Sequence, residues 1–292
     1  MHDIGVTPKQ DNCTKYPSSS QLEIKLQQNR LGKTIITHKY ANHPLCISRP
    51  FYLDNYQNRA YLYLGNNSPG LFPKDDFKFS FDCDKNTQLY LTDRAANKVH
   101  PHTNLKNIAQ VNFEFNIAAR AYVEFLPESL ILYQDAALEQ VTKIKMDSSS
   151  TLFLSEIILP GRLARGEFYL FHSYFNRLQV YSLDGDLWFS DGMYLSGINN
   201  SFKDSNLFAK YAILGNAIAV LPSSQVKLLQ TQIENLAMAH NLLVATSLLP
   251  QERGLLIRIN GEKTTLIKQY FSTVLNLIRK IHQDCPLPYI PK

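Results

Sequence analysis

The feature that most constrains the fold of this chain is an alternation of apolar and polar residues with a period of two. The segment 77–83, FKFSFDC, places an apolar side chain at every second position. The same pattern recurs in residues 22–26, 121–125 and 178–180. Alternation of this kind predicts strands with one buried face. No helical pattern interrupts these segments, so the first two thirds of the chain are expected to be all-β.

The period changes near the C-terminus. Apolar side chains fall three and four residues apart in residues 226–240, and again from about residue 262 to 282, which predicts two helices. Between them, residues 254–259 are interpreted as a buried strand that ends at a turn formed by Asn260 and Gly261. The C-terminal part is therefore expected to be a small α+β unit.

These patterns predict a division of the chain into three parts. Residues 1–20 are expected to form a flexible tail, residues 21–200 a β-rich core, and residues 201–292 a C-terminal α+β subdomain packed on that core. Periodicity alone is compatible with a sandwich or a barrel for the core.

Composition excludes several classes of protein. The 30 Lys and Arg residues exceed the 25 Asp and Glu residues by only five, and they are scattered, so nucleic-acid binding gains little support. The apolar runs are too short for a membrane-spanning helix, and the N-terminus lacks a signal-peptide pattern. The four cysteines form no CxxC pair, which argues against a zinc knuckle or a disulfide framework. We expect a reduced, cytoplasmic protein that binds neither membrane nor nucleic acid.

Catalysis by this chain alone is not expected. The sequence contains no GxSxG, HExxH or GxxxxGK[ST] pattern. One enzymatic alternative stays open, an all-β hydrolase with Glu124 and Glu128 as acid and base. Residues four apart on a regular strand are separated by roughly 13 Å, beyond the roughly 5 to 10 Å of glycosidase pairs, although Pro127 can break that geometry.

The segment 121–181 contains compact polar signatures that point to a family. EFLPES at 124–129, SEIILPGRLARGE at 155–167 and NRLQV at 176–180 resemble the urease accessory protein UreD, also called UreH. The pattern of that family is roughly E-W-L-P-Q-[DE]-x-I, then W-[DE]-x-x-x-x-G-R-x-x-x-G-E, then N-R-L-x-V. The motif residues here are Glu124, Pro127, Gly161, Arg162, Gly166 and Glu167. Arg162 and Glu167 are interpreted as bracing a bend between strands.

The sequence departs from the family pattern at two places. The family loop P-G-G-x-x-G-G-D-x-L lies over residues 68–77, where Asp75 takes the place of the aspartate and Pro73 and Lys74 replace a glycine pair. Paired glycines usually supply positive φ or close backbone approach, so the loop is expected to run differently here. Gly192 stands where relatives have the arginine of an E-R pair.

The resemblance implies a fold and a role. The fold is a flattened β-helix-like stack of short strands with a small C-terminal α+β part containing two helices. The role is that of a scaffold that binds a UreF-type protein, reaches a UreG-type GTPase through it, and delivers nickel to apo-urease, with a dimer of the accessory complex possible. No tightly bound cofactor is implied, only Ni²⁺ in transit. A relative that keeps the fold but has lost urease work, and serves as an interaction scaffold, is the alternative.

An ion in transit needs weak and widely spaced oxygen ligands, because a compact cluster of imidazoles or thiolates would retain it. At positions that the resemblance associates with an internal passage, Asp75, Glu156 and Asp191 are expected as anionic lining, Asn97 as a neutral contact and Lys98 as a charge partner.

Glu156 is the sharpest of these candidates. It is a lone carboxylate in the apolar run 152–159, so it must meet water, a cation or a donor. The alternative for Glu156 is an ion pair with Arg162 or another base. The alternative for Asp75 is a solvated turn, and for Asp191 a turn with Gly192.

Overall fold

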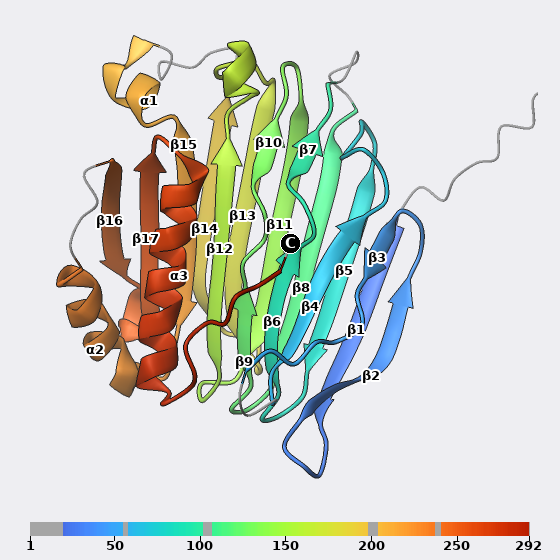
Figure 1. The fold of residues 1–292 in the computed structure, drawn as a ribbon, viewed down its shortest axis with the longest axis vertical. Helices are drawn as coiled ribbons and strands as arrows, with labels where there is room; N and C mark the ends of the chain where they lie inside the picture. Colours follow the sequence, from blue (N-terminus) through green and yellow to red (C-terminus); the bar gives the residue numbers. More distant parts are fainter. Residues whose placement is uncertain (1–19, 55–57, 102–106, 198–203, 237–240, 292) are drawn as a thin grey trace, which may run out of the picture.

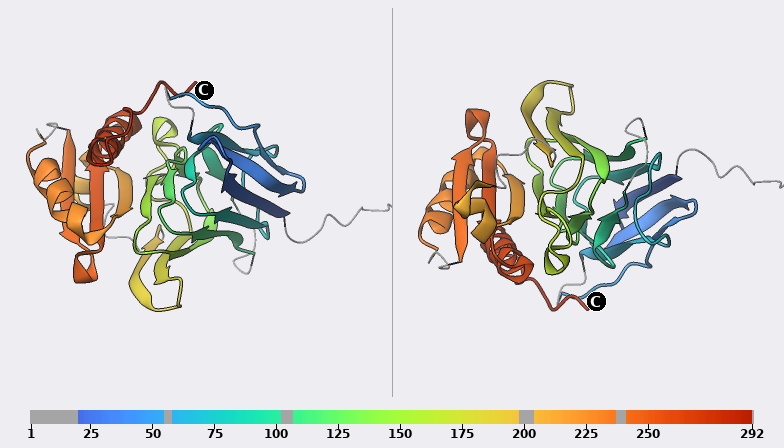
Figure 2. Two further views of the ribbon diagram at one scale, coloured as in Figure 1. Left: turned by 90° about the horizontal axis from the view of Figure 1, so that it is seen from below. Right: turned by 90° about the horizontal axis from the view of Figure 1, so that it is seen from above.

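The computed structural model describes residues 20–54, 58–101, 107–197, 204–236 and 241–291. Within that part of the chain the strands form two sheets that pack face to face, and two helices cover part of the outer face of one of them (Figures 1 and 2). The expected tail, apart from Ser20, lies outside the described residues. No helix in the described ranges is both long and apolar enough to span a membrane.

The first sheet has seven strands in the described residues. In spatial order they are β14 (Leu187–Ser196), β13 (Ser173–Ser182), β11 (Ala137–Met146), β8 (Ala109–Ile117), β5 (Asp76–Cys83), β1 (Ser20–Gln28) and β2 (Thr34–Ala41). The four pairings from β1 to β13 are parallel, and the two edge strands β14 and β2 pair antiparallel.

The second sheet has ten strands in the described residues. Its spatial order is β16 (Leu242–Leu248), β17 (Gly254–Gly261), β15 (Ile213–Val220), β12 (Thr151–Leu159), β9 (Tyr122–Phe125), β6 (Gln88–Asp93), β4 (Ala60–Asn66) and β3 (Leu45–Ile47). The short strands β10 (Leu130–Leu132) and β7 (Asn97–Val99) pair with each other, and β10 also pairs with β12.

The chain passes back and forth between the two sheets. Strands β4, β6, β9 and β12 run parallel in the second sheet, while β5, β8, β11 and β13 alternate with them along the sequence and run parallel in the first. Each coil therefore contributes one of these strands to each sheet, and two coils add the short strands β7 and β10 to the second sheet. This is the flattened β-helix-like stack that the family resemblance implies and that periodicity alone left undecided.

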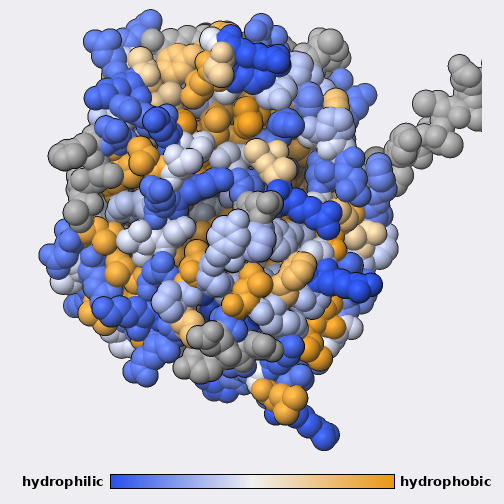
Figure 3. All heavy atoms as spheres, viewed as in Figure 1, coloured by the Kyte–Doolittle hydropathy of each residue, from blue (hydrophilic) through white to orange (hydrophobic). Residues whose placement is uncertain are grey.

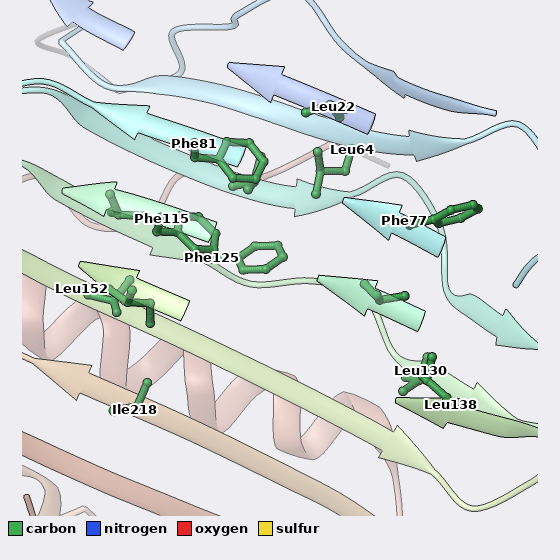
Figure 4. Packing of buried hydrophobic residues seen from close by; sticks show 14 of the residues in the cluster. Leu22, Leu64, Phe77, Phe81, Phe115, Phe125, Leu130, Leu138, Leu152 and Ile218 are labelled. Atoms are coloured by element: carbon green, nitrogen blue, oxygen red, sulfur yellow. The ribbon is translucent and has the colours of Figure 1, made fainter. Parts of the chain in front are cut away.

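Apolar side chains of the alternating strands pack against each other in the space between the sheets (Figure 4). The parallel register places like residues beside each other, so Phe81 pairs with Phe115, and their rings stack with centroids 5.0 Å apart. Both residues are at most 1% exposed. Burial of such a ring stabilises the fold by roughly 1.5–3 kcal/mol. This free energy determines which face of each strand turns inward.

The second sheet is buried on both faces around β12. Helices α2 (Ser223–Glu234) and α3 (Thr264–Ile281) pack on its outer face, where Phe153 and Ile157 of β12 meet Phe271 and Val274 of α3. This double burial explains why residues 152–159 are almost continuously apolar instead of alternating. The surface on the α3 side mixes hydrophilic and hydrophobic residues (Figure 3). A single turn of helix, α1 (Asn206–Lys210), precedes β15.

The C-terminal helices and the strand between them are confirmed, with differences at their ends. The second helix begins at Thr264 and ends at Ile281. The first ends at Glu234, earlier than expected, because Asn235 caps it and Leu236 is no longer helical, and residues 237–240 lie outside the described residues. The expected Asn260–Gly261 turn is wrong, because both residues continue β17 and pair with β16, a strand that the sequence pattern did not predict. Strands β15 and β17 extend the second sheet beyond β12.

Candidate functional site

A cavity of about 270 Å³ lies between the two sheets and is partly open to solvent, since exposed residues such as Arg94 and Lys98 are part of its lining. A water molecule takes up about 30 Å³ of liquid, so the cavity has room for several waters. Much of its wall is apolar, with Phe79, Phe113 and Phe125 among the lining side chains. Polar side chains line it as well, and they include four of the five predicted passage residues: Asn97, Lys98, Glu156 and Asp191.

Glu156 is placed in this wall by β12, with its residue only 8% exposed. Its carboxylate accepts hydrogen bonds from Gln140 Nε2 at 2.8 Å, from Asn176 Nδ2 at 2.8 Å and from the Tyr174 hydroxyl at 2.5 Å. The Asn216 side chain also hydrogen-bonds it. Glu156 belongs to none of the ion pairs among the described residues, so a buried carboxylate is held here by neutral donors.

The electrostatic state of Glu156 follows from this environment. Burial raises the pKa of its carboxyl above the ordinary value, and the hydrogen bonds from Tyr174, Asn216, Gln140 and Asn176 act in the opposite direction. No base forms an ion pair with this carboxylate among the described residues, and the two bases of the lining, Arg94 and Lys98, are exposed. A cation that enters the cavity would meet a carboxylate that no ion pair neutralises.

Asp191 lies in β14 at the boundary of the two sheets. Its two carboxylate oxygens accept hydrogen bonds from Arg258 Nη2 of β17 at 2.8 and 2.9 Å. The side chains of Asp191 and Arg258 are 27% and 44% exposed, so this ion pair joins the two sheets where the cavity approaches solvent. Gly192 is in the same edge strand, opposite Arg177, so the alternative of a turn at this place is wrong.

Asn97 and Lys98 begin the short strand β7. Asn97 Nδ2 donates to Asp93 Oδ2 at 3.0 Å, and the same oxygen accepts the backbone N–H of Glu128 at 3.1 Å. The Lys98 side chain is exposed, and its backbone carbonyl accepts the N–H of Leu71 at 2.7 Å. Asp93 and Glu128 therefore supply the carboxylates at this part of the wall.

Asp75 is not among the residues that line the cavity. Its Oδ2 accepts the backbone N–H of Phe72 at 2.8 Å, and its own N–H donates to the Phe72 carbonyl at 3.0 Å, so it closes a turn. Partial burial raises the pKa of the Asp75 carboxyl, and this backbone hydrogen bond opposes the shift. Lys74, in the same turn, adopts a positive φ of 72°. Lys74 thus adopts the positive φ that a glycine of the family loop would adopt without strain, and Pro73 does not.

The motif residue Glu124 faces the opposite side of the second sheet, toward α3. Its carboxylate accepts from Arg279 Nε at 2.8 Å and from Arg279 Nη2 at 2.5 Å, and Arg59 Nη2 lies 3.6 Å away. All three side chains are fully buried. Arg59 is paired in turn with Asp284 at 2.6 Å and Asp54 at 3.7 Å. We call Asp54, Arg59, Glu124, Arg279 and Asp284 the buried ionic cluster.

Glu124 and Glu128 do not share a site. Glu124 belongs to the buried ionic cluster, whereas Glu128 lines the cavity and forms an ion pair with Lys268 of α3. The two carboxylates proposed for an all-β hydrolase are thus engaged by different bases of α3, Arg279 and Lys268. Pro127 also lines the cavity.

The GRLARGE motif forms a braced loop after β12. Arg162 and Glu167 form an ion pair with each other, and Arg162 Nε lies 2.8 Å from both Glu167 oxygens. Gly161 has φ 138°, and a Cβ added to it would lie 2.4 Å from the Glu167 carbonyl oxygen. Gly166 has φ 77° at the end of the short 3₁₀ turn Leu163–Arg165. Arg162 is therefore committed to Glu167 and not to Glu156.

Sequence reasoning missed most of the groups that surround Glu156 and Asp191. Asn216 carries the same signal as Glu156, since it is a lone polar residue in the apolar strand ILGNAIAV, but the resemblance is weak in that region. Asn176 lies within a quoted motif, and nothing in the motif says that it faces Glu156. Arg258 alternates with apolar neighbours in β17, which places it on the inner face without identifying Asp191 as its partner.

Fold and cavity together define a class of protein: a β-helical scaffold that encloses a partly polar interior space. No group of three or more His, Cys, Asp or Glu side chains that could hold a metal ion occurs within the described ranges. The lining residues whose side chains could bind a metal ion carry carboxylates, carboxamides, the hydroxyls of Ser68, Thr142 and Ser155, and the thioether of Met193.

Comparison with known proteins gives the family. The profile of the UreD urease accessory protein family matches residues 18–292. The chain is 44% identical over 278 residues to the urease accessory protein UreD of Trichodesmium erythraeum, covering 94% of this chain and 100% of the relative. It is 27% identical over 268 residues to UreD of Bacillus cereus, covering 90% and 95% of the two chains.

This chain belongs to the UreD family of urease accessory proteins. Members of the family are accessory proteins and not catalytic enzymes, and their role is in urease maturation.

Proposed function

We propose that this protein passes nickel ions through the cavity between its sheets to apo-urease, as part of a cytoplasmic complex with a UreF-type protein and, through it, a UreG-type GTPase. The observation that carries the proposal is Glu156, a buried carboxylate in the cavity wall that is surrounded by neutral donors. A carboxylate in that setting attracts a dication, and no ion pair with a base of the described residues competes for it.

The lining suits transit better than storage. Its ligand atoms are oxygens from separate carboxylates and amides, which bind nickel weakly compared with imidazole or thiolate groups. The apolar wall offers no ligand, so an ion there keeps its own water shell. Dispersed and weak contacts allow the ion both to enter and to leave.

The Asp191–Arg258 ion pair fits the role of a gate at one end of the passage. It joins the edges of the two sheets and is partly exposed. A dication that reaches Asp191 would compete with the guanidinium for the carboxylate, and a docked partner could favour the open arrangement. The Glu128–Lys268 ion pair, whose carboxylate also lines the cavity, could act in the same way at another part of the wall.

The test is urease activation in cells that express the cognate urease with its accessory proteins. Glu156→Gln keeps the shape of the side chain and removes its charge, so we expect urease to assemble but to contain less nickel and to have lower activity. Leu178→Trp narrows the cavity without removing an oxygen, because Leu178 lines it on β13 opposite Asp191. This variant is also expected to reduce nickel loading.

Glu114→Gln is the matched control, because Glu114 is an exposed strand residue outside the cavity. Association with the UreF-type partner is measured in the same cells by co-purification. Normal nickel loading in both cavity variants, with intact complexes, would contradict the passage. Failure of the unmodified chain to associate with the UreF-type partner or with urease would instead favour a relative that has lost urease work.

A further inference from the structure

Three carboxamides surround the Glu156 carboxylate, and they come from both sheets. Gln140 lies on β11 and Asn176 on β13 in the first sheet, while Asn216 lies on β15 in the second. Gln140 and Asn176 each donate an N–H to a different carboxylate oxygen. A carboxamide carries an N–H donor and a C=O acceptor on the same terminal carbon. A rotation of 180° about the last side-chain bond therefore places the oxygen where the nitrogen was.

The separations in this ring match those of ligands around a small dication. Gln140 Nε2 and Asn176 Nδ2 both lie 2.8 Å from their carboxylate oxygens. Two adjacent oxygen ligands of an octahedral ion with metal–oxygen distances of about 2.0–2.1 Å are about 2.9 Å apart. After a half-turn of each amide, the carboxylate oxygens and amide oxygens would therefore stand at the spacing of neighbouring octahedral ligands.

Asn176 gives an independent indication. Its Oδ1 is buried and has no hydrogen-bond partner among the described residues. Such an oxygen is costly to leave unpaired in a protein interior. Rotation of the amide onto a cation would give this oxygen a partner and, in exchange, release the N–H from the carboxylate.

We propose that Glu156, Gln140 and Asn176 form a reversible way station for a small octahedral dication, in which the two amides exchange N–H for C=O contacts when the ion arrives. The inference rests on the proposed function, since it names the place where nickel pauses and the groups that hold it. When the site is empty, the amides stabilise the carboxylate by hydrogen bonds. When it is filled, one carboxylate, two amide oxygens and retained waters surround the ion.

The exchange explains why such a site would release its ion. Each ligand that the ion gains replaces a hydrogen bond that the empty site already has, so the net gain on binding is small. Amide oxygens are neutral, which also keeps the affinity below that of a site with several carboxylates. The amides, more than the carboxylate, therefore set how long the ion stays.

The test measures Ni²⁺ at the site directly, on the full-length chain. Ni²⁺ is paramagnetic and broadens NMR signals of nearby nuclei. Met193 lines the same cavity, and its Sδ lies 3.9 Å from Asn216 Nδ2, so its ¹³C-labelled methyl group reports on the site. Met146 is six residues beyond Gln140 on β11, about 20 Å along the strand, and serves as the internal reference.

We expect Ni²⁺ to broaden the Met193 signal in a saturable way and to leave Met146 nearly unchanged. Glu156→Gln should abolish this broadening. Asn176→Asp should lower the apparent Kd for Ni²⁺ at least tenfold, because a carboxylate replaces the neutral amide. If the Asn176 amide oxygen binds the ion, Asn176→Leu should raise the Kd for Ni²⁺ severalfold. If the amide only donates a hydrogen bond to Glu156, it competes with the ion for the carboxylate, and Asn176→Leu should lower the Kd.

The outcomes separate this inference from the proposed function. Broadening of Met193 that persists in Glu156→Gln, or a lower Kd in Asn176→Leu, overturns the way station. If either of these results is obtained and urease activation is still impaired in Glu156→Gln, nickel passage remains supported but the way station is not. Conversely, the expected changes in Kd together with normal urease activation in Glu156→Gln and Asn176→Asp would support the site and contradict its use in passage. Unchanged thermal unfolding and an unshifted Met146 signal verify that each variant is folded.

Discussion

Arg279→Met tests whether the buried ionic cluster holds α3 against the second sheet. In the folded protein Arg279 contacts Glu124 through two hydrogen bonds of 2.8 and 2.5 Å, and both side chains are fully buried. The cluster contains three carboxylates and two guanidinium groups. Methionine fills a similar space but leaves three carboxylates with Arg59 as the remaining base.

The expected loss of stability follows from that imbalance. Removing one partner of a buried ion pair usually costs about 3–5 kcal/mol. Glu124 keeps a contact with Arg59 at 3.6 Å, so we place the cost near the lower end, at about 3 kcal/mol. For a chain of this size that corresponds to a fall in Tm of roughly 6 °C.

The double variant Glu124→Leu/Arg279→Met supplies the comparison. It removes one acid and one base, so the charge balance of the cluster returns to that of the unmodified protein, and Arg59 remains paired with Asp284 and Asp54. We expect the double variant to be more stable than Arg279→Met alone, with a coupling energy of at least about 2 kcal/mol.

Urea unfolding followed by circular dichroism measures these differences, with Tm from calorimetry as a second measure. A loss below about 1 kcal/mol in Arg279→Met, or a double variant that loses the full sum of the two single variants, would refute the reasoning. Either result would mean that solvent or chain relaxation compensates Glu124 in the absence of Arg279.

Three further predictions concern separate features. Gly161→Ala should destabilise the protein by about 2–4 kcal/mol, because Gly161 has a φ of 138° and the new Cβ would lie 2.4 Å from the Glu167 carbonyl oxygen. Urea unfolding measures the loss of stability, and a loss under about 1 kcal/mol would contradict the prediction. Lys74→Gly should raise the free energy of unfolding by up to about 1 kcal/mol, because glycine adopts the observed φ of 72° without strain; a loss of stability in the same assay would show that the lysine side chain contributes more than its backbone costs. Burial lowers the pKa of His282 below its ordinary value of 6.5, so the native state binds fewer protons than the unfolded state near that pH, and the stability should fall as the pH drops below 6.5. Measured as Tm from pH 7.5 to 5, this pH dependence should become flatter in His282→Gln. An unchanged slope in the variant would argue against the role of His282.

The strands of the core were predictable because a half-buried strand shows its burial in its own sequence. Residues 77–83 alternate strictly, and β5 covers them with the expected residues inward. Strand β16 was not predictable, since it lies at a sheet edge, is exposed over most of its length and has no burial pattern to reveal it. The coiling of the chain between two sheets came from family resemblance, because alternation does not specify which strands become neighbours.

The candidate site shows the same limit. Glu156 stood out from sequence because a lone carboxylate in an apolar run is costly to bury. Its neighbours did not, and neither did Arg258, which pairs with Asp191 from 67 residues away, or Lys268, which pairs with Glu128 from 140 residues away. Asp75 matched a family position, yet the structure places it in a turn outside the cavity lining. Sequence identified which charges are unusual, and only the fold showed which of them meet.

The buried ionic cluster joins parts of the chain that are made at very different times. Arg279 reaches Glu124 across 155 positions, and Asp284 reaches Arg59 across 225. Until α3 has been synthesised, Glu124 lacks Arg279 and has only the more distant Arg59 as a base. The second sheet is therefore expected to reach its full stability only after α3 has docked, and a chain truncated before α3 should be more sensitive to proteolysis than the full chain.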